Sequence, residues 1–136
     1  MGEGHGRLDD VLVVDAQGPA APEEVWRRYS HASRWPTWAP QISGVSGAGD
    51  PVAPGDRGWV RGPFPLRLPY TILDVVADER RWSWQVGLGP ASVVMEHGVD
   101  ALDVGSRAWV RIDVPAPLAL PYAPLARLAL RRLVCP

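Results

Sequence analysis

Residues 21–38 read A-P-E-E-V-W-R-R-Y-S-H-A-S-R-W-P-T-W, and this stretch decides the fold. Pro22 suits the first position of a helix, because its missing N–H would have been unpaired there in any case. Glu23 and Glu24 follow in the first turn, where the helix dipole favours negative charge. Each glutamate also has an arginine four residues further on, at the spacing of a helical ion pair. The stretch therefore predicts a short helix that begins at Pro22.

One face of this helix is apolar. Val25, Trp26 and Tyr29 recur at helical spacing, and Ala32 extends the same stripe. Such a stripe faces the core in a globular protein. We therefore expect this half of the stretch to build the fold, with Trp26 a plain core residue.

Two tryptophans follow in the W-P-T-W segment. Proline disfavours helical backbone at the residue before it, so Pro36 predicts a turn that ends the helix by Arg34 or Trp35. A tryptophan is a large apolar body with one N–H that needs a partner. Trp35 and Trp38 therefore either complete the core or line a pocket, and we favour the pocket.

Length and composition limit the possible functions. The chain has 136 residues, which suits one domain over residues 8–136 with a flexible tail over residues 1–7. A net charge of −1 gives no reason to expect nucleic acid or an anionic membrane as partner. The chain has no lysine, which excludes Schiff-base catalysis by a lysine amine.

The single cysteine and the hydropathy pattern bear on the compartment. Cys135 has no second cysteine to pair with, so a reducing, cytoplasmic setting is expected. No apolar run reaches the roughly 18 residues that a membrane span needs. The first residues also lack the apolar region of a signal peptide.

Most of the remaining chain has the pattern of strands with turn-like links, which implies antiparallel neighbours. The Leu- and Ala-rich residues 122–134 predict a C-terminal helix. This order indicates an α+β fold with helices on one face of an antiparallel sheet. The expected strands are Leu8–Ala16, Gln41–Ser46, Arg57–Gly62, Leu66–Val76, Arg81–Val86, Ala91–Leu102 and Gly105–Val114.

Side chains alternate between the two faces of a strand, so sequence parity predicts which residues point to the core. The apolar parity places His97 inward and Glu96 outward. Arg61 is expected to point outward, although its strand is short and the opposite facing would bring it to the interior. The predicted inward set is Leu66, Leu68, Tyr70, Ile72, Trp82, Trp84, Val86, Ala91, Val93, Met95, His97, Val99, Ala108, Val110, Ile112 and Val114.

Two strands carry nearly the same pentapeptide, R-G-W-V-R at residues 57–61 and R-A-W-V-R at residues 107–111. Each places a tryptophan between two arginines on the outer face. One interpretation is that guanidinium groups stack over exposed indoles. The other is a surface for a partner or a second copy of the chain, since Trp and Arg are enriched at interaction hot spots.

His97 is the main candidate for chemistry, because an imidazole can transfer protons near neutral pH. It is either an acid or base in a cavity, or a structural histidine satisfied by its neighbours. The three histidines and one cysteine do not have the spacing of metal ligands, so neither a metal nor another cofactor is expected.

A series of motifs resembles the SRPBCC superfamily, and more narrowly its polyketide cyclase/dehydrase-type members. In order they are A-P-E-E-V-W, W-P-T-W-A-P, R-G-W-V-R-G-P, R-R-W-S-W, M-E-H-G-V and P-L-A-L-P-Y-A-P-L-A-R. The resemblance implies a START-like helix-grip fold, in which a curved antiparallel sheet of about six or seven strands wraps a C-terminal helix. Two short helices would follow the first strand. It implies a hydrophobic cavity between sheet and helix, but not one reaction.

The leading functional hypothesis is therefore the binding of a small hydrophobic, polycyclic or polyketide-like molecule, with or without cyclase or dehydratase activity. The alternatives are a non-catalytic carrier, or an interaction module that uses the Arg/Trp faces, with a homodimer among the options. His97 and Arg61 are the catalytic candidates. The predicted ligand-binding residues are Tyr29, Trp35, Trp38, Tyr70, Trp82, Trp84, Met95 and His97.

Overall fold

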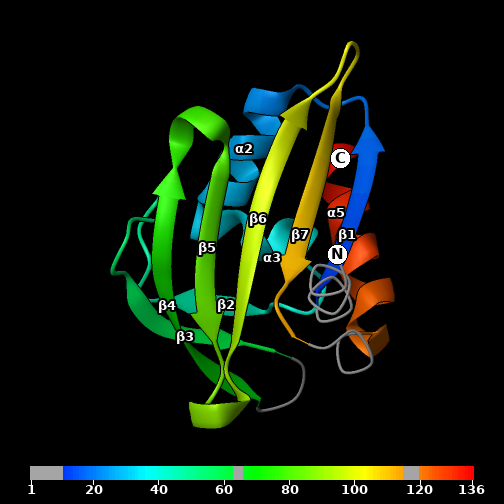
Figure 1. Ribbon diagram of the computed structural model, residues 1–136. Helices are drawn as coiled ribbons and strands as arrows, with labels where there is room; N and C mark the ends of the chain where they lie inside the picture. Colours follow the sequence, from blue (N-terminus) through cyan, green and yellow to red (C-terminus); the bar gives the residue numbers. More distant parts are fainter. Residues whose placement is uncertain (1–10, 63–65, 115–119) are drawn as a thin grey trace, which may run out of the picture.

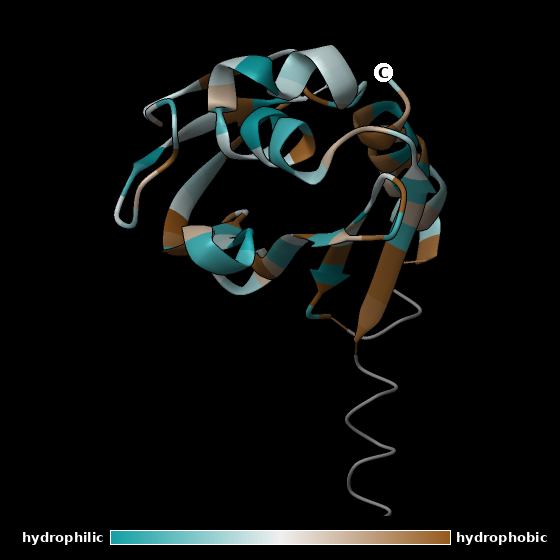
Figure 2. Ribbon diagram, turned by 90° about the horizontal axis from the view of Figure 1, so that it is seen from above, coloured by the Kyte–Doolittle hydropathy of each residue, from teal (hydrophilic) through white to brown (hydrophobic). Residues whose placement is uncertain are grey.

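The computed structural model describes residues 11–62, 66–114 and 120–136. Its fold is a curved antiparallel sheet with helices on one face. Seven strands follow the order β1-β7-β6-β5-β4-β3-β2. In Figure 1 the helices α2, α3 and α5 lie behind the sheet, and Figure 2 shows from above that they occupy one side of it. The elements are β1 (Leu12–Gly18), α2 (Pro22–Ser30), η1 (Ala32–Arg34), α3 (Trp35–Trp38), β2 (Gly44–Ser46), β3 (Arg57–Arg61), β4 (Arg67–Val76), η2 (Ala77–Glu79), β5 (Arg81–Val86), η3 (Gly89–Ala91), β6 (Val93–Ala101), β7 (Ser106–Ile112), η4 (Leu120–Tyr122) and α5 (Ala123–Val134).

This architecture confirms the predicted α+β helix-grip fold. Most strands lie close to their expected bounds, but β2 covers only Gly44–Ser46 of the expected Gln41–Ser46. β5 spans the predicted residues, whereas β6 begins at Val93 rather than Ala91. The difference arises because Gly87 and Gly89 have positive φ and lead into the 3-10 turn η3. Leu66 and Ala91, both predicted to point inward, are exposed because they lie just outside their strands.

The segment after α2 differs from the prediction. The chain leaves the helix at His31, whose backbone is extended, and Pro36 then lies in the first turn of the one-turn helix α3. A proline is tolerated there, because the first N–H groups of a helix have no partner within it. The expectation that Pro36 ends the helix and makes W-P-T-W a turn is therefore wrong.

The apolar stripe of α2 faces the sheet as predicted. Val25, Tyr29 and Ala32 are buried, while Trp26 is only half-buried and packs at the margin of the core. The predicted ion pairs four residues apart are replaced by others: Arg27 bonds Glu24 at 2.6 Å, and Glu23 bonds Arg80, which lies between η2 and β5.

The C-terminal helix α5 packs on β1 and β7. Arg28 of α2 holds the C-terminal end of α5 by donating to the carbonyl oxygens of Arg132 at 3.2 Å and Leu133 at 2.8 Å. The backbone N–H of Ala20 also donates to the carbonyl of Val134 at 3.1 Å. These bonds satisfy carbonyls that a helix end leaves free, and they hold α5 across the concave face of the sheet.

Candidate functional site

An aromatic-lined pocket lies between the inner face of the sheet and α5. Its free volume is about 40 Å³, which is room for a few water molecules. Four groups of elements contribute to it: α2 with α3, the loop after α3, the inner faces of β5 to β7, and η4 with α5. The lining residues are Tyr29, Trp35, Trp38, Gln41, Ile42, Trp82, Trp84, Met95, His97, Val110, Tyr122, Ala126, Ala129 and Leu130.

Strand pairing sets the sheet side of this pocket. Trp82 of β5 lies opposite His97 of β6, and Trp84 lies opposite Met95. Alternation places all four side chains on the same face, where each is buried. The parity argument therefore found this wall from the sequence alone.

Stacked rings occupy most of the space in front of that wall. The Trp82 indole lies parallel to the His97 ring at 3.8 Å between centroids, and Trp35 stacks on Trp82 at 5.1 Å. Tyr29 meets the edge of this stack, with its ring centroid 5.5 Å from that of His97. The interior is thus nearly filled. Pockets that hold drug-sized ligands measure about 300–1,000 Å³, so such a ligand fits here only if side chains move.

The rings contributed by the helical side have their polar atoms paired. The indole N–H of Trp35 donates to the carbonyl of Tyr29 at 2.9 Å, and that of Trp38 donates to the carbonyl of Arg28 at 3.0 Å. The Tyr29 hydroxyl donates to the carbonyl of Trp109 at 2.8 Å. Burial raises the pKa of Tyr29 well above its usual range, so this hydroxyl stays protonated.

Three polar atoms of other lining residues are buried without a hydrogen-bond partner in the described part of the chain. They are the indole nitrogens of Trp82 and Trp84 and the amide oxygen of Gln41. The amide nitrogen of Gln41 donates to the Tyr122 hydroxyl at 2.9 Å and so links the loop after α3 to η4. Buried polar groups in folded proteins are nearly always paired with protein or with ordered water, so these three atoms are the ones that a water or a ligand in the pocket could satisfy.

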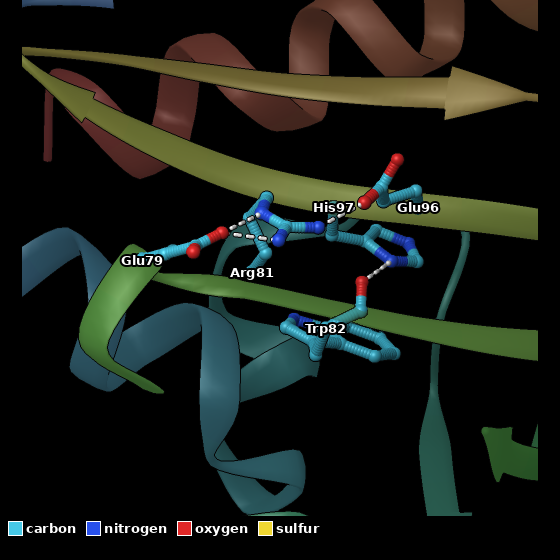
Figure 3. Close-up of polar contacts among 5 residues, drawn as sticks. All are labelled: Glu79, Arg81, Trp82, Glu96 and His97. Atoms are coloured by element: carbon cyan, nitrogen blue, oxygen red, sulfur yellow. Dashed lines mark hydrogen bonds and ion pairs between the residues drawn. The ribbon is translucent and has the colours of Figure 1, made fainter. Parts of the chain in front are cut away.

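His97 is buried and electrically neutral. Desolvation lowers its pKa to about 3, against a smaller opposing contribution from its hydrogen bond with the Trp82 backbone. Nδ1 lies 3.3 Å from the Trp82 carbonyl oxygen (Figure 3), and a carbonyl can only accept, so Nδ1 carries the hydrogen. Nε2 is then left with a free lone pair.

Seven of the eight predicted ligand-binding residues line the pocket; Tyr70 does not. Its ring packs at 5.4 Å from that of Trp84, but its hydroxyl donates to the Ser46 carbonyl at 2.7 Å and ties β4 to β2. Sequence reasoning missed the lining residues Gln41, Ile42, Val110, Tyr122, Ala126, Ala129 and Leu130. Strand parity did predict that Val110 points inward. The three-residue spacing of Ala126 and Ala129 places both on one face of α5, and this spacing could have identified that face from the sequence.

Arg61 lies outside the pocket. In β3 the buried residue is Val60, whereas Arg57, Trp59 and Arg61 are exposed on the opposite face. The alternative facing that would have brought Arg61 to the interior is wrong, and its position gives it no contact with the candidate site.

The outer face of the sheet carries paired charges. Figure 3 shows Arg81 between Glu79 and Glu96, on the side of β5 opposite to Trp82. Its bond to Glu96 measures 2.6 Å. Alternation thus separates a charged outer layer from an uncharged inner one within two neighbouring strands.

The tryptophans of the two similar pentapeptides both lie on the outer face, as predicted. The guanidinium of Arg67, from the neighbouring strand, lies 4.6 Å from the centre of the half-exposed Trp59 ring. Trp109 instead covers Gly98, where an added Cβ would lie 2.2 Å from its ring. The stacking interpretation therefore holds for Trp59, whereas Trp109 is largely covered by its own sheet.

Within the described ranges 11–62, 66–114 and 120–136, no three His, Cys, Asp or Glu side chains gather as a metal site would require. None of the helices in these ranges has the length and hydropathy to cross a membrane.

Fold and interior together define a helix-grip protein with an apolar, aromatic centre. The chain belongs to the family described as polyketide cyclase / dehydrase and lipid transport, whose model matches residues 12–134. This confirms the resemblance read from the motifs. A search of curated proteins found no match to this chain.

Solved structures share the fold at low identity. Ara h 8.0201 is 12% identical with a TM-score of 0.70, and the match covers 90% of this chain and 93% of that one. DynU16, a protein of the dynemicin biosynthetic locus, is 18% identical with a TM-score of 0.72, covering 92% of this chain and 47% of that one. Norcoclaurine synthase from Thalictrum flavum, in complex with dopamine and hydroxybenzaldehyde, is 16% identical with a TM-score of 0.63, covering 93% and 87%.

Proposed function

We propose that this protein binds a small hydrophobic molecule, polycyclic or polyketide-like in shape, between its sheet and α5. The supporting observation is the pair of buried indole N–H groups of Trp82 and Trp84, which have no partner among the described residues. A completed core pairs such donors, whereas a binding site holds a few polar groups ready among apolar walls. The family description, which includes both cyclases and lipid transport, agrees with this proposal.

The ligand gains its room by displacing side chains on the helical side. Trp82, Trp84 and His97 stand on central strands that are paired on both edges. Trp35 and Trp38 both stand on the one-turn helix α3, which together with η1 before it spans only seven residues. In this proposal a planar ligand takes the space that Trp35 fills beside Trp82 and Trp84.

A carrier or sequestering role is the function that the site supports best. A general acid needs a pKa near the working pH, and the pKa of His97, at about 3, keeps it unprotonated at neutrality. Binding requires no such proton. We place the protein in the cytoplasm, as its single exposed cysteine suggests.

Cyclase or dehydratase activity is the second candidate. It is favoured by the free lone pair on Nε2 of His97, which could accept a proton from a bound substrate. Norcoclaurine synthase, of the same fold, is an example solved with two aromatic molecules. A templated cyclisation would also use the walls to hold the substrate in a reactive shape.

The binding proposal is tested by titrating the protein with Nile red, a neutral dye whose emission reports an apolar environment. Ala126→Leu adds bulk to a lining position of α5, and Leu128→Phe adds bulk to an exposed position of the same helix. We expect the first variant to lose dye binding by about tenfold or more and the second to bind as the wild type does. Equal binding by both variants would contradict the proposed site, provided that both melt cooperatively.

Carrier and enzyme are separated by comparing turnover with affinity for one candidate polyketide. His97→Ala changes the site, and Arg61→Ala is the control on the outer face. If affinity and turnover fall together in His97→Ala, the ring serves binding. If turnover alone falls, the second candidate is favoured.

A further inference from the structure

The pocket contains hydrogen-bond donors that have no acceptor in the part of the chain that the structure describes. Two hydrogen-bond donors, the indole nitrogens of Trp82 and Trp84, are unpaired within the described residues. Both side chains are more than nine-tenths buried. A tryptophan N–H can only donate, so the group that completes it must be an acceptor.

The lining contains no positive charge among the described residues. Its titratable members are Tyr29, Tyr122 and His97, and burial favours the neutral form of all three. An anion placed here would meet no counter-charge, and an unpaired buried charge is among the most costly groups in a protein.

Two arginines on elements that line the pocket, Arg28 of α2 and Arg81 of β5, are held elsewhere. Arg28 donates to the backbone carbonyls that end α5. Arg81 is fixed on the outer face by Glu79 and Glu96 (Figure 3). Neither guanidinium can therefore turn to an anion in the pocket without giving up its own partners.

We infer that the pocket selects an uncharged ligand that carries a hydrogen-bond acceptor, such as a ketone or ether oxygen, bound by the indole N–H of Trp82 or Trp84, and that it rejects anions such as carboxylates. This inference rests on the proposed function, since it names the chemical class for the same site. Gln41 Oε1 and His97 Nε2 are acceptors themselves, so a hydroxyl elsewhere on the ligand would find a partner.

The test uses matched probes that compete with Nile red. 9-Fluorenone and fluorene share one ring system and differ by a carbonyl in place of a methylene. Fluorenone-4-carboxamide and fluorenone-4-carboxylate share a shape and differ in charge. We expect the ketone to bind about tenfold tighter than the hydrocarbon, as one hydrogen bond allows, and the carboxylate to bind at least about thirtyfold more weakly than the carboxamide.

Variants assign the effect to the indole N–H groups. Trp82→Phe and Trp84→Phe keep an aromatic ring and remove the donor, and Trp59→Phe is the control on the outer face. The ketone preference should fall towards unity in at least one of the first two variants and persist in the third. Measuring the ratio of two ligands on one variant cancels a general change in stability or packing.

The outcomes separate this inference from the proposed function. If ketone and hydrocarbon bind equally well, or if both phenylalanine variants keep the preference, the inference is overturned while hydrophobic binding stands. If the carboxylate binds as tightly as the carboxamide, the uncharged character of the site is overturned. If none of the probes displaces the dye and the dye itself does not bind, the proposed function fails and the inference fails with it.

Discussion

Removing the side chain of Trp35 should both destabilise the protein and open its interior. This indole is 1% exposed, stacks on Trp82 at 5.1 Å and donates to the Tyr29 carbonyl at 2.9 Å. The stack contributes about 0.5–1.5 kcal/mol and the hydrogen bond about 1 kcal/mol. With the cavity that remains, Trp35→Ala should lower the free energy of unfolding by about 3–5 kcal/mol.

Urea unfolding followed by circular dichroism measures this loss. Trp59→Ala is the matched control, because the same substitution at a 41% exposed ring removes only a stack with Arg67. That control should cost less than about 1.5 kcal/mol. Free indole should raise the unfolding midpoint of Trp35→Ala by refilling the space, and should raise that of the wild type less, because there it must first displace Trp35.

A loss below about 1 kcal/mol for Trp35→Ala, or a loss no greater than that of Trp59→Ala, would refute the packing argument. Failure of indole to stabilise the variant would refute the claim that this position can receive a planar molecule. Both results are independent of the identity of the natural ligand.

Three further predictions follow from single contacts. The folded protein holds the pKa of His97 at about 3, below the ordinary 6.5, so between these pH values only the unfolded state binds a proton at this ring. The free energy of unfolding should therefore fall by up to about 1.4 kcal/mol per pH unit below pH 6.5. His97→Gln should reduce that slope, as measured by urea unfolding at about pH 7 and about pH 5. Gly98→Ala should cost about 1–3 kcal/mol because its Cβ would lie 2.2 Å from the Trp109 ring, and adding Trp109→Ala should recover part of that loss in a double-mutant cycle. Arg28→Ala should cost about 1–3 kcal/mol by freeing the carbonyl of Leu133, and amide hydrogen exchange should rise first at the end of α5.

The sheet side of the site could be predicted from sequence because alternation in a strand has a period of two. Once Arg81–Val86 and the residues around Met95 were assigned as strands, the inward positions of Trp82, Trp84 and His97 followed. The Leu- and Ala-rich residues 122–134 predicted the C-terminal helix, and the family resemblance implied that the sheet wraps it. The facing of Arg61 was less certain from sequence because its strand is short. In the structure Val60 is buried, so Arg61, the next residue, points to the outer face.

The free volume of the site could not be predicted from sequence. It depends on how Trp35 and Trp38 are oriented, and this follows from tertiary contacts such as the bond from Trp35 to the Tyr29 carbonyl. The same holds for Gln41, which was expected in the strand Gln41–Ser46 but reaches the pocket from the loop before β2. The Tyr70 hydroxyl likewise finds its partner on a strand distant in sequence.

The most direct test of the account observes the indole N–H signals during ligand addition. In a protein labelled with ¹⁵N at tryptophan, 9-fluorenone should shift the indole signals of Trp82 or Trp84, together with that of the displaced Trp35. The signals of Trp59 and Trp109 on the outer face should stay in place. Shifts confined to Trp59, or unchanged signals from Trp35, Trp82 and Trp84 at a concentration that displaces Nile red, would contradict a ligand site between the sheet and α5.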